Sequence, residues 1–368
     1  MQIGFDAKRA FFNYSGLGNY SRYVISGICN MYPENEYLLY TPGKGKYVPP
    51  ENSRIIEPDS LGKKFPSLWR SFSLARKITK DHTTLYHGLS NEIPAGSEKR
   101  PFKTCVTIHD LIFMKYPAFY PVTDRMIYRK KVLYAVKNAG HIIATSEQTR
   151  RDLIELLHAV PEKISVVYQG CNPAFYIPAA KEEKERIRKK YNLPENFLLS
   201  VGTVEERKNL LRIAEAMHTG KIDFPVIAAG RRTPYAVKVE KYINEKKINH
   251  FRLIGEIPAE DLPALYQMAT AFLYPSLYEG FGIPVLEAIN SGVPVITSAG
   301  GCLEETGGKG AVLVNPLKSE EIADAIRLLL DNSQLRETLI EKGYSHAAGF
   351  RDEVTIPRLY SVYESCLK

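Results

Sequence analysis

The sequence predicts an α/β protein of two doubly wound domains, in which each parallel sheet carries helices on both faces. The chain has 368 residues, of which 44% are hydrophobic, so its length suits two domains that each bury a core. Short strand-like runs alternate with helix-like runs, most cleanly in the second half, and this alternation is typical of parallel sheets. No apolar run reaches the roughly 20 residues of a membrane span.

The first half opens with the strand-like run MQIGFDA (1–7), which leads through Gly16 and Gly18 into a helix-like stretch. Further strands are expected at EYLLYT (36–41), RIIE (54–57), TLYHG (84–88), in TCVTIHDLIF as a β-branched run that ends in His109 and Asp110, at HIIAT (141–145) and at ISVVYQG (164–170). Helices are expected at 68–78, at 124–138 and after Ser146, a residue type that favours the helix N-cap. The first domain therefore spans residues 1–170.

The second series of strand–helix units starts after the charged helix-like stretch KEEKERIRKKYN (181–192). Its expected strands are FLLSVGT (197–203), PVIAAG (225–230), FRLIGEI (251–257), AFLYP (271–275), PVITS (294–298) and GAVLVNP (310–316). The helices expected between and after them are at about 209–217, 235–246, 260–268 and 319–331. The second domain spans 171–348, and residues 349–368 form a bend followed by a helix past Pro357, too short for a domain of its own.

The segment EGFGIPVLE (279–287) is the most chemically informative part of the chain. Gly280 and Gly282 permit backbone angles that bring amide N–H groups close to a ligand, and Pro284 suits the first turn of a helix. The free N–H groups and dipole of a helix N-terminus attract anions. Glu279 and Glu287 flank this anion site, where carboxylates suit sugar hydroxyls. A tight loop followed by an ordinary solvated helix acid is equally consistent with the segment.

Arg207 and Lys208 are adjacent cations in the loop that leaves the first strand of the second domain. Because they precede a helix in this loop, we expect them to point toward the same crevice as Gly282 and to neutralise a diphosphate. A solvent-facing charged turn is the alternative interpretation.

Two places in the first half carry weaker signals. Gly16 and Gly18 do not complete the GxGxxG pattern, so they indicate either a ligand-binding turn or a plain glycine turn. His109 ends a β-branched run, where α/β sheets place ligands, and a structural histidine is the alternative. Asp110 is a candidate helix cap.

Charge is divided unevenly along the chain, whose formal net charge is +8. Residues 1–168 hold 24 Lys and Arg against 15 Asp and Glu, so the first half is basic and suits an anionic partner such as a membrane surface or a lipid-linked phosphate. The helix at 124–138 has a basic face, although Tyr128, Val132 and Leu133 can equally form a core stripe. No nucleic-acid motif is visible. The N-terminal residues lack a signal-peptide pattern and the five cysteines are scattered, which predicts a cytoplasmic protein without a zinc site.

These motifs together resemble the GT4-type retaining glycosyltransferases, including bacterial mannosyltransferases of polysaccharide and O-antigen assembly. EGFGIPVLE is similar to the E-x7-E pattern of that family. Five further segments resemble it in order: SGLGNY, TIHDL, ATSEQTRRDL, VGTVEERKNL and AGGCLEETGGKGAVLVNP. The resemblance implies the GT-B fold, with two Rossmann-like domains facing a cleft and a C-terminal helix that returns to the first domain.

The resemblance also implies roles for single residues. Glu287 would hold the nucleotide ribose, and Glu279 would face hydroxyls of the transferred sugar. Arg207 and Lys208 would bind the diphosphate, and His109 would contact the sugar from the first domain. The other implied donor-binding residues are Gly16 and Gly18 in a loop that closes over the phosphates, Phe281, Gly282 and Ile283 through their backbone amides, Thr203, which stands where many relatives carry Arg, and Ile257 near the base.

The implied reaction moves a hexose, best mannose from GDP-mannose, from a nucleotide sugar to a glycan or lipid-linked acceptor with retention of configuration. No metal or other cofactor is expected, because fixed cations and helix N–H groups stabilise the departing diphosphate. Peripheral contact with the inner face of an anionic membrane is expected, and nucleic acid is not. The alternatives are a UDP-glucose or other UDP-sugar donor, a nucleotide-sugar epimerase of the same fold, and a non-enzymatic basic binding module.

Overall fold

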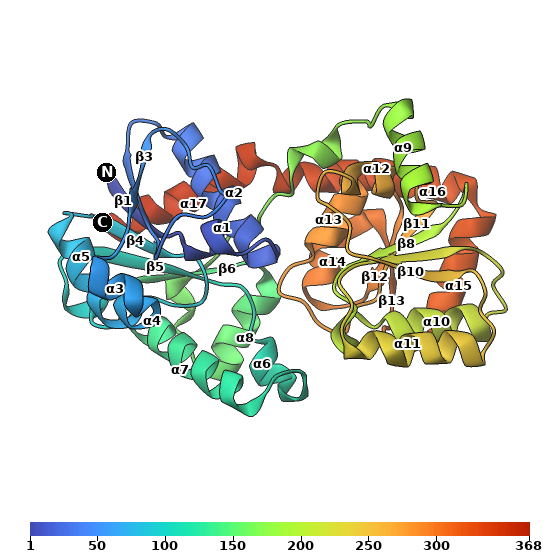
Figure 1. Cartoon of the computed structure of the whole chain (residues 1–368), viewed down its shortest axis with the longest axis horizontal. Coiled ribbons are helices and arrows are strands. Elements are labelled where there is room, and N and C mark those ends of the chain that lie inside the picture. The colour runs from blue at the N-terminus through green and yellow to red at the C-terminus, as the bar shows by residue number, and fades with distance from the viewer. The chain divides into compact units, whose positions relative to one another are not determined.

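A computed structural model describes residues 1–368, apart from the side chain of Leu61. The chain divides into two compact units, which are coloured along the chain in Figure 1. The first unit contains Met1–Gly170 together with Arg351–Lys368, and the second contains Cys171–Phe350. Each unit is built on one parallel sheet, so the predicted fold class of two doubly wound domains is confirmed.

The sheet of the first unit has seven strands in the order β3-β2-β1-β4-β5-β6-β7. The strands are β1 (Gln2–Asp6), β2 (Glu36–Tyr40), β3 (Ser53–Ile56), β4 (Leu85–Gly88), β5 (Lys103–Ile108), β6 (His141–Ala144) and β7 (Ile164–Val166). All pair in parallel, and the central ones are buried because apolar and β-branched side chains fill both faces.

Helices cover both faces of this first sheet. They are α1 (Lys8–Phe12), α2 (Gly16–Met31), α3 (Ser60–Lys64), α4 (Pro66–Leu68), α5 (Leu74–Lys80), α6 (Ile112–Lys115), α7 (Val122–Asn138), α8 (Glu147–Leu157) and α17 (Asp352–Leu367). A π-helical turn, Trp69–Ser73, joins α4 to α5. The apolar faces of α2 and α17 share one core cluster with β1, and α7 belongs to another with β5 and β6.

The sheet of the second unit has six strands in the order β10-β9-β8-β11-β12-β13. They are β8 (Leu198–Val201), β9 (Val226–Ala229), β10 (Phe251–Gly255), β11 (Ala271–Tyr274), β12 (Val295–Ser298) and β13 (Ala311–Val314). The helices are α9 (Lys181–Tyr191), α10 (Leu210–Thr219), α11 (Pro234–Glu245), α12 (Leu262–Gln267), α13 (Ile283–Asn290), α14 (Gly301–Gly307), α15 (Ser319–Asp331) and α16 (Ser333–Ala347).

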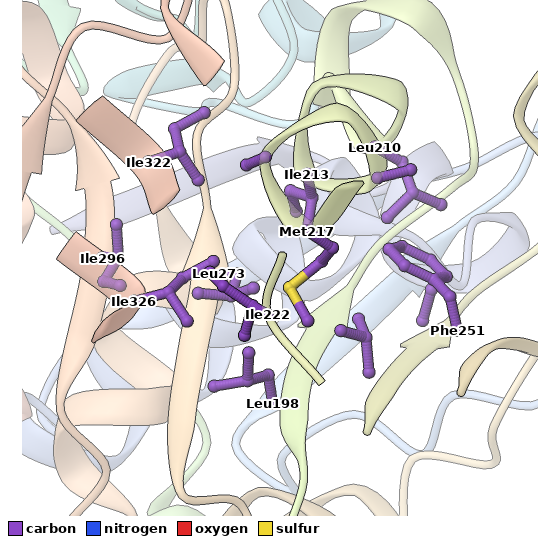
Figure 2. Packing of buried hydrophobic residues seen from close by; sticks show 14 of the residues in the cluster. Leu198, Leu210, Ile213, Met217, Ile222, Phe251, Leu273, Ile296, Ile322 and Ile326 are labelled. Carbon is purple, nitrogen blue, oxygen red and sulfur yellow. The ribbon is translucent and has the colours of Figure 1, made fainter. Parts of the chain in front are cut away.

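A dense aliphatic core lies between one face of the second sheet and its covering helices. Figure 2 shows Ile213 and Met217 of α10 and Ile322 and Ile326 of α15 packed over strand residues such as Leu273. Each of these side chains is at most 1% exposed. On the other face, the ring of Tyr266 of α12 packs at a tilt of 35° against that of Phe272 of β11, with centroids 5.1 Å apart. The two layers hold the strand ends, and the loops that leave them, in fixed positions.

The C-terminal helix α17 packs within the first unit, as the fold prediction required. Ile356 belongs to the same core cluster as β1, and Tyr360 stacks on Tyr32 with ring centroids 3.5 Å apart. The Tyr363 hydroxyl lies 2.6 Å from His87 Nδ1. The helix begins at Asp352, directly after the expected bend, and continues past Pro357. Nowhere in the described part of the chain is a helix both long enough and apolar enough to cross a membrane.

Three details of the first unit correct the sequence interpretation. A short helix, α1, stands between β1 and α2, and Gly16 and Gly18 lie in the first turn of α2 instead of in a separate turn. In α7, Val132 is buried, but Leu133 is only half-buried and Tyr128 is 41% exposed, so the expected core stripe is wrong. Val132, Ala135 and Val136 form the buried face instead.

Candidate functional site

The second sheet has a topological switch point between β8 and β11, because the strand order reverses there. Ligands of doubly wound sheets bind outside the carboxyl ends of the strands at such a point. The loop that leaves β8 carries Arg207 and Lys208 in a 3₁₀ turn, and the loop that leaves β11 carries Ser276 and Glu279. Chain segments about 70 residues apart in sequence therefore meet at one edge of the sheet.

Glu279 forms ion pairs with both cations of the β8 loop. Lys208 Nζ lies 2.6 Å from Glu279 Oε1, and Arg207 Nη1 pairs with Oε2. Arg207 and Lys208 thus contact the first residue of the EGFGIPVLE segment, and their predicted role in neutralising a diphosphate stays a prediction. The sequence interpretation did not foresee these ion pairs and placed Glu279 only against a sugar.

Neutral groups complete the surroundings of the Glu279 carboxylate. The Ser276 hydroxyl donates to Oε1 at 2.7 Å, and the Tyr274 hydroxyl donates to the same oxygen at 3.1 Å. Lys208 Nζ also lies 4.8 Å from the centroid of the Tyr274 ring. Arg207 is held from its other side by the Tyr278 carbonyl at 2.8 Å and by Glu205 at 2.6 Å. The side chains of the cluster are therefore fixed before any ligand binds.

The charges of the cluster shift the pKa values of its members. Burial alone raises the pKa of Glu279, but Lys208 and Arg207 outweigh it and lower the pKa to about 2. Burial is the largest influence on Lys208 and lowers its pKa, although the Glu279 carboxylate opposes this shift. Glu279 is therefore ionised at every physiological pH and cannot act as a proton donor.

The glycine loop reaches α13 through a conformation that requires glycine. Gly282 has φ +144°, and a Cβ there would come within 3.0 Å of the Leu303 side chain. Gly280 does not take a positive φ, so the expectation of special backbone angles holds for Gly282 only. The helix begins at Ile283 with Pro284 in its first turn, as expected. Pro284 has no N–H, and the Val285 and Leu286 amides donate to the Gly282 carbonyl at 2.9 and 3.2 Å, so an anion at this helix start would rely on the amides of Gly282 and Ile283.

Glu287 lies one turn into α13 and has a different environment from Glu279. It accepts a hydrogen bond from the Tyr266 hydroxyl at 3.0 Å. Burial raises the pKa of Glu287 to about 7, and the Tyr266 hydroxyl partly offsets this rise. The two acids of the motif therefore differ in charge state near neutrality: Glu279 is fully ionised and Glu287 titrates.

Asn209 is a structural residue of the site that the sequence interpretation missed. It takes the left-handed conformation, with φ +61°, immediately before α10. Its side-chain amide donates to the Pro275 carbonyl at 3.0 Å and to the Pro316 carbonyl at 2.6 Å. These bonds tie the β8 loop to the segments that follow β11 and β13. The sequence offered one indication of this role: an Asn stands directly before a helix, and Asn tolerates the left-handed region of backbone conformation.

The sequence matches known glycosyltransferases over both units. Residues 182–346 match the family described as Glycosyl transferases group 1, and residues 24–175 match Glycosyltransferase Family 4. The chain is 31% identical over 291 residues to the O-antigen chain mannosyltransferase B of Escherichia coli. The matched region covers 76% of this chain and 74% of that protein. The chain belongs to the GT4-type glycosyltransferases.

Two further comparisons agree with this assignment. The glycosyltransferase is 28% identical over 225 residues to the O-antigen chain mannosyltransferase RfbU of Salmonella typhimurium, across 60% of this chain and 59% of that protein. It is similar in structure to sucrose-phosphate synthase from Thermosynechococcus elongatus, with a TM-score of 0.78 over 99% of this chain and 98% of that one. At 21% identity the second likeness supports the GT-B fold alone.

In the first unit of the glycosyltransferase, His109 lies directly after β5 and is 7% exposed. Its Nε2 donates to the Leu89 carbonyl at 2.8 Å, and its ring makes an edge contact with Tyr20, with centroids 4.6 Å apart. Burial lowers the pKa of His109 to about 4, so the ring is neutral at pH 7. With Nε2 as the donor, Nδ1 of the neutral ring is an acceptor. The Asp110 side chain accepts from the Ile112 amide at 3.0 Å, but the N-cap position of α6 is Leu111, so Asp110 is not the capping residue.

Four predicted donor-binding residues occupy less distinctive positions. Gly18 packs so closely on the chain that a Cβ would lie 1.7 Å from the Asn13 carbonyl oxygen, whereas Gly16 faces open space. Gly18 therefore has a packing reason to be glycine. In the second unit, Thr203 is half-buried after β8, and Ile257 is 8% exposed after β10. The roles of all four in donor binding remain predictions.

Proposed function

We propose that the enzyme transfers mannose from GDP-mannose to a glycan or lipid-linked acceptor with retention of configuration and without a metal ion. The observation that carries the proposal is the Arg207–Lys208–Glu279 cluster beside the first turn of α13, at the switch point of the second sheet. Mannose is the preferred sugar because both O-antigen relatives described above are named mannosyltransferases.

The donor would bind through three groups of the second unit. The diphosphate would lie against Arg207, Lys208 and the backbone amides of Phe281, Gly282 and Ile283. The Glu287 carboxylate would accept hydrogen bonds from the ribose hydroxyls. Glu279 holds both cations in place and keeps one face toward the sugar hydroxyls.

Catalysis in this proposal rests on charge stabilisation. Breaking the bond from sugar to phosphate builds positive charge on the anomeric carbon and negative charge on the departing diphosphate. Arg207 and Lys208 stabilise the diphosphate, supplying charge at the place where a metal ion would otherwise act. The acceptor attacks from the same face, and the leaving phosphate takes its proton. Glu279, held by two cations and two hydroxyls, positions groups and does not form a covalent intermediate. In the first unit, His109 is neutral and would offer Nδ1 as a hydrogen-bond acceptor to a hydroxyl group.

Calorimetric titration tests the donor site. GDP, UDP and ADP would be titrated into the metal-free enzyme and into Glu287→Ala and Lys208→Ala. Matched controls are Glu245→Ala and Lys241→Ala, since both side chains are exposed on α11. We expect tight GDP binding that both site variants lose and both controls keep. Preferential binding of UDP would mean that the donor is a UDP-sugar and not GDP-mannose. If none of the three nucleotides bound, the proposal would be overturned. The anomeric configuration of the product, read by NMR, tests retention separately.

The acceptor is expected at a membrane because the first half of the chain is basic. We expect the enzyme to associate peripherally with vesicles that contain anionic lipid. Association through charge weakens as salt rises, since the Debye length falls from about 10 Å at 0.1 M to about 3 Å at 1 M. Vesicle binding that is unchanged in 1 M salt would contradict the electrostatic part of this expectation.

A further inference from the structure

Tyr266 of α12 contacts Glu287, one of the two acids of the candidate donor site. Tyr266 is 0% exposed, and its hydroxyl donates to Glu287 Oε2 at 3.0 Å. In the proposed function Glu287 binds the ribose, whereas Tyr266 has no exposed surface and touches no ligand directly. Any effect of Tyr266 on the donor therefore has to pass through Glu287.

The Tyr266 hydroxyl is held in a fixed position by its surroundings. Phe175 meets the Tyr266 ring edge-on with centroids 5.4 Å apart, and Phe272 of β11 packs against the same ring. The start of α12 is fixed as well, because Asp261, which is 1% exposed, accepts a hydrogen bond from Lys190 of α9 at 2.6 Å. Closely packed rings leave little room for another side-chain rotamer, so the hydroxyl points at Glu287 before any donor binds.

The Tyr266 hydroxyl also stays protonated near neutral pH. Burial raises the pKa of Tyr266 well above its usual value, and Glu287, Tyr274 of β11 and Cys171 add to the rise. Tyr266 is therefore a hydrogen-bond donor to Glu287 at every pH at which the enzyme is folded and Glu287 titrates.

Glu287 has little support apart from this bond. Among the described residues, Tyr266 is the one hydrogen-bond donor to its side chain, so Oε1 is left available. The elements packed on α13 are α12, α14, α16, β11, β12 and the 3₁₀ turn Pro173–Tyr176. Burial raises the pKa of Glu287 to about 7, the Tyr266 hydroxyl opposes the rise, and no acid or base of α14 or α16 adds to either influence. Glu279, in contrast, is compensated by two cations.

We propose that Tyr266 is a positioning residue for donor binding: it holds one carboxylate oxygen of Glu287 and leaves the other to accept from a ribose hydroxyl. This inference rests on the proposed function, because it concerns how Glu287 binds the ribose. The ribose hydroxyl would be a second donor to the carboxylate, and hydrogen bonds to the ionised form favour ionisation. Donor binding at pH 7 should therefore release a proton from the Glu287 carboxyl group to the buffer.

The pH dependence of GDP-mannose affinity in Tyr266→Phe tests the proposal. Phenylalanine keeps the ring and its packing and removes only the hydroxyl, so the variant should fold. Because the lost bond favours ionised Glu287, we expect the midpoint of the rise in affinity with pH to move upward by about one pH unit. The Kd measured by calorimetry should then be about fivefold higher than in the wild type at pH 7, and within about twofold of it at pH 8.5. Tyr266→3-fluorotyrosine, which has a more acidic hydroxyl and hence a stronger donor, should move the midpoint downward.

Tyr191→Phe is the matched control. The Tyr191 hydroxyl also donates to a buried carboxylate of the second unit, that of Asp261, at 2.6 Å. Tyr191→Phe should therefore lose a comparable bond and keep the wild-type Kd and pH profile. If Tyr266 acts through Glu287, Tyr266→Phe/Glu287→Gln should bind GDP-mannose as Glu287→Gln does, within about twofold.

Proton release gives a readout that loss of packing alone would not change. Calorimetry at pH 7 in two buffers of different ionisation enthalpy counts the protons released when GDP-mannose binds. For complete ionisation in the complex we expect about 0.5 proton in the wild type and about 0.9 in Tyr266→Phe, whose Glu287 starts more protonated. Glu287→Gln should release none, and Tyr191→Phe should match the wild type.

The outcomes separate this inference from the proposed function. If the wild type binds GDP-mannose and Tyr266→Phe has the same pH profile and proton release, Tyr266 does not position Glu287 and the donor site stands. If Tyr266→Phe weakens binding equally in the presence of Glu287→Gln, or if Tyr191→Phe shifts the pH profile in the same way, the effect comes from packing and the inference is overturned. If the wild type binds no nucleotide, the proposed function falls and this inference falls with it.

Discussion

Glu279 is the residue on which the candidate donor site depends most. A carboxylate that is 11% exposed would be costly to ionise alone, and here two cations and two hydroxyls compensate it. Because the pKa of Glu279 is lower in the folded protein than in the unfolded chain, its ionised form contributes to the free energy of unfolding. The same ion pairs that orient Arg207 and Lys208 also stabilise the second unit.

Replacing Glu279 by Gln should destabilise the second unit in a pH-dependent way. The pKa falls from the usual 4.5 to about 2 in the folded protein, which corresponds to about 3 kcal/mol at pH 7. Because the folded pKa is lowered, this stabilisation is complete above pH 4.5 and is lost as the pH falls toward 2. Urea denaturation of wild type and Glu279→Gln between pH 7 and pH 3 measures it. A gap between the two proteins that stays constant over this range would contradict the assignment.

Glu287 should make donor affinity depend on pH around neutrality. Its raised pKa of about 7 means that the carboxylate, the form that accepts from ribose, is populated only as the pH rises through 7. We expect the affinity for GDP-mannose to increase roughly tenfold from pH 6 to pH 8, since each pKa unit corresponds to a factor of ten. The diphosphate of a nucleotide sugar does not titrate in this range. In Glu287→Gln the affinity should be lower and independent of pH, and a retained slope would rule out Glu287 as its source.

At the scale of elements, the loop from β11 to α13 combines backbone geometry with function. Gly282 ends the loop at a φ that side chains rarely adopt, and it packs against Leu303 and Thr306 of α14. The positions of the Gly282 and Ile283 amides, at the start of α13, depend on this close approach. The loop therefore has to be tight for the anion site to exist.

Gly282→Ala should lower both stability and nucleotide affinity. We expect a loss of about 1–3 kcal/mol in stability from backbone strain, with the contact to Leu303 adding to it. Gly96→Ala is the matched control, because Gly96 has φ +80° but no atom within 4 Å of its added Cβ. The control should lose stability and keep GDP affinity in the titration described above. Equal GDP affinity in both variants would show that the loop geometry does not determine nucleotide binding.

The regular elements were largely predictable from sequence, and the contacts between them were not. Each strand was expected because a short β-branched or aromatic run ended at a glycine, proline or polar turn. The helix α14, Gly301–Gly307, was not expected, because its flanking glycines are typical of a loop. The ion pairs of Glu279 were beyond prediction because they depend on β8 and β11 being neighbours, which is a property of the strand order. The ion pairs of Arg70 with Asp6 and Glu92 were not predicted either, because they also depend on which strands are neighbours.

At the scale of the whole molecule, the chain returns at its end to the unit in which it began. The helix α17 follows the second unit in sequence but supplies Ile356 and Tyr363 to the first core. Ile356 is 0% exposed and touches the position of Gly27, where a Cβ would lie 2.5 Å from its side chain. The core of the first unit is therefore built in part by a helix that follows the second unit in sequence.

Ile356→Ala should weaken the first unit selectively. Truncating a fully buried isoleucine costs about 2–5 kcal/mol, through lost transfer free energy and the cavity that remains. Hydrogen exchange followed by mass spectrometry locates the effect: exchange should speed up in peptides from β1, β4 and α2, which supply residues to the core cluster that contains Ile356. Peptides from β8 and β11 should exchange as in the wild type, and GDP affinity should be unchanged, because the donor cluster draws no residue from α17. A matched truncation in the second core, Ile326→Ala, should produce the reverse pattern, since Ile326 packs among residues of α10 and β12. If both variants accelerated exchange equally in both sheets, the two cores could not be treated as separate sources of stability.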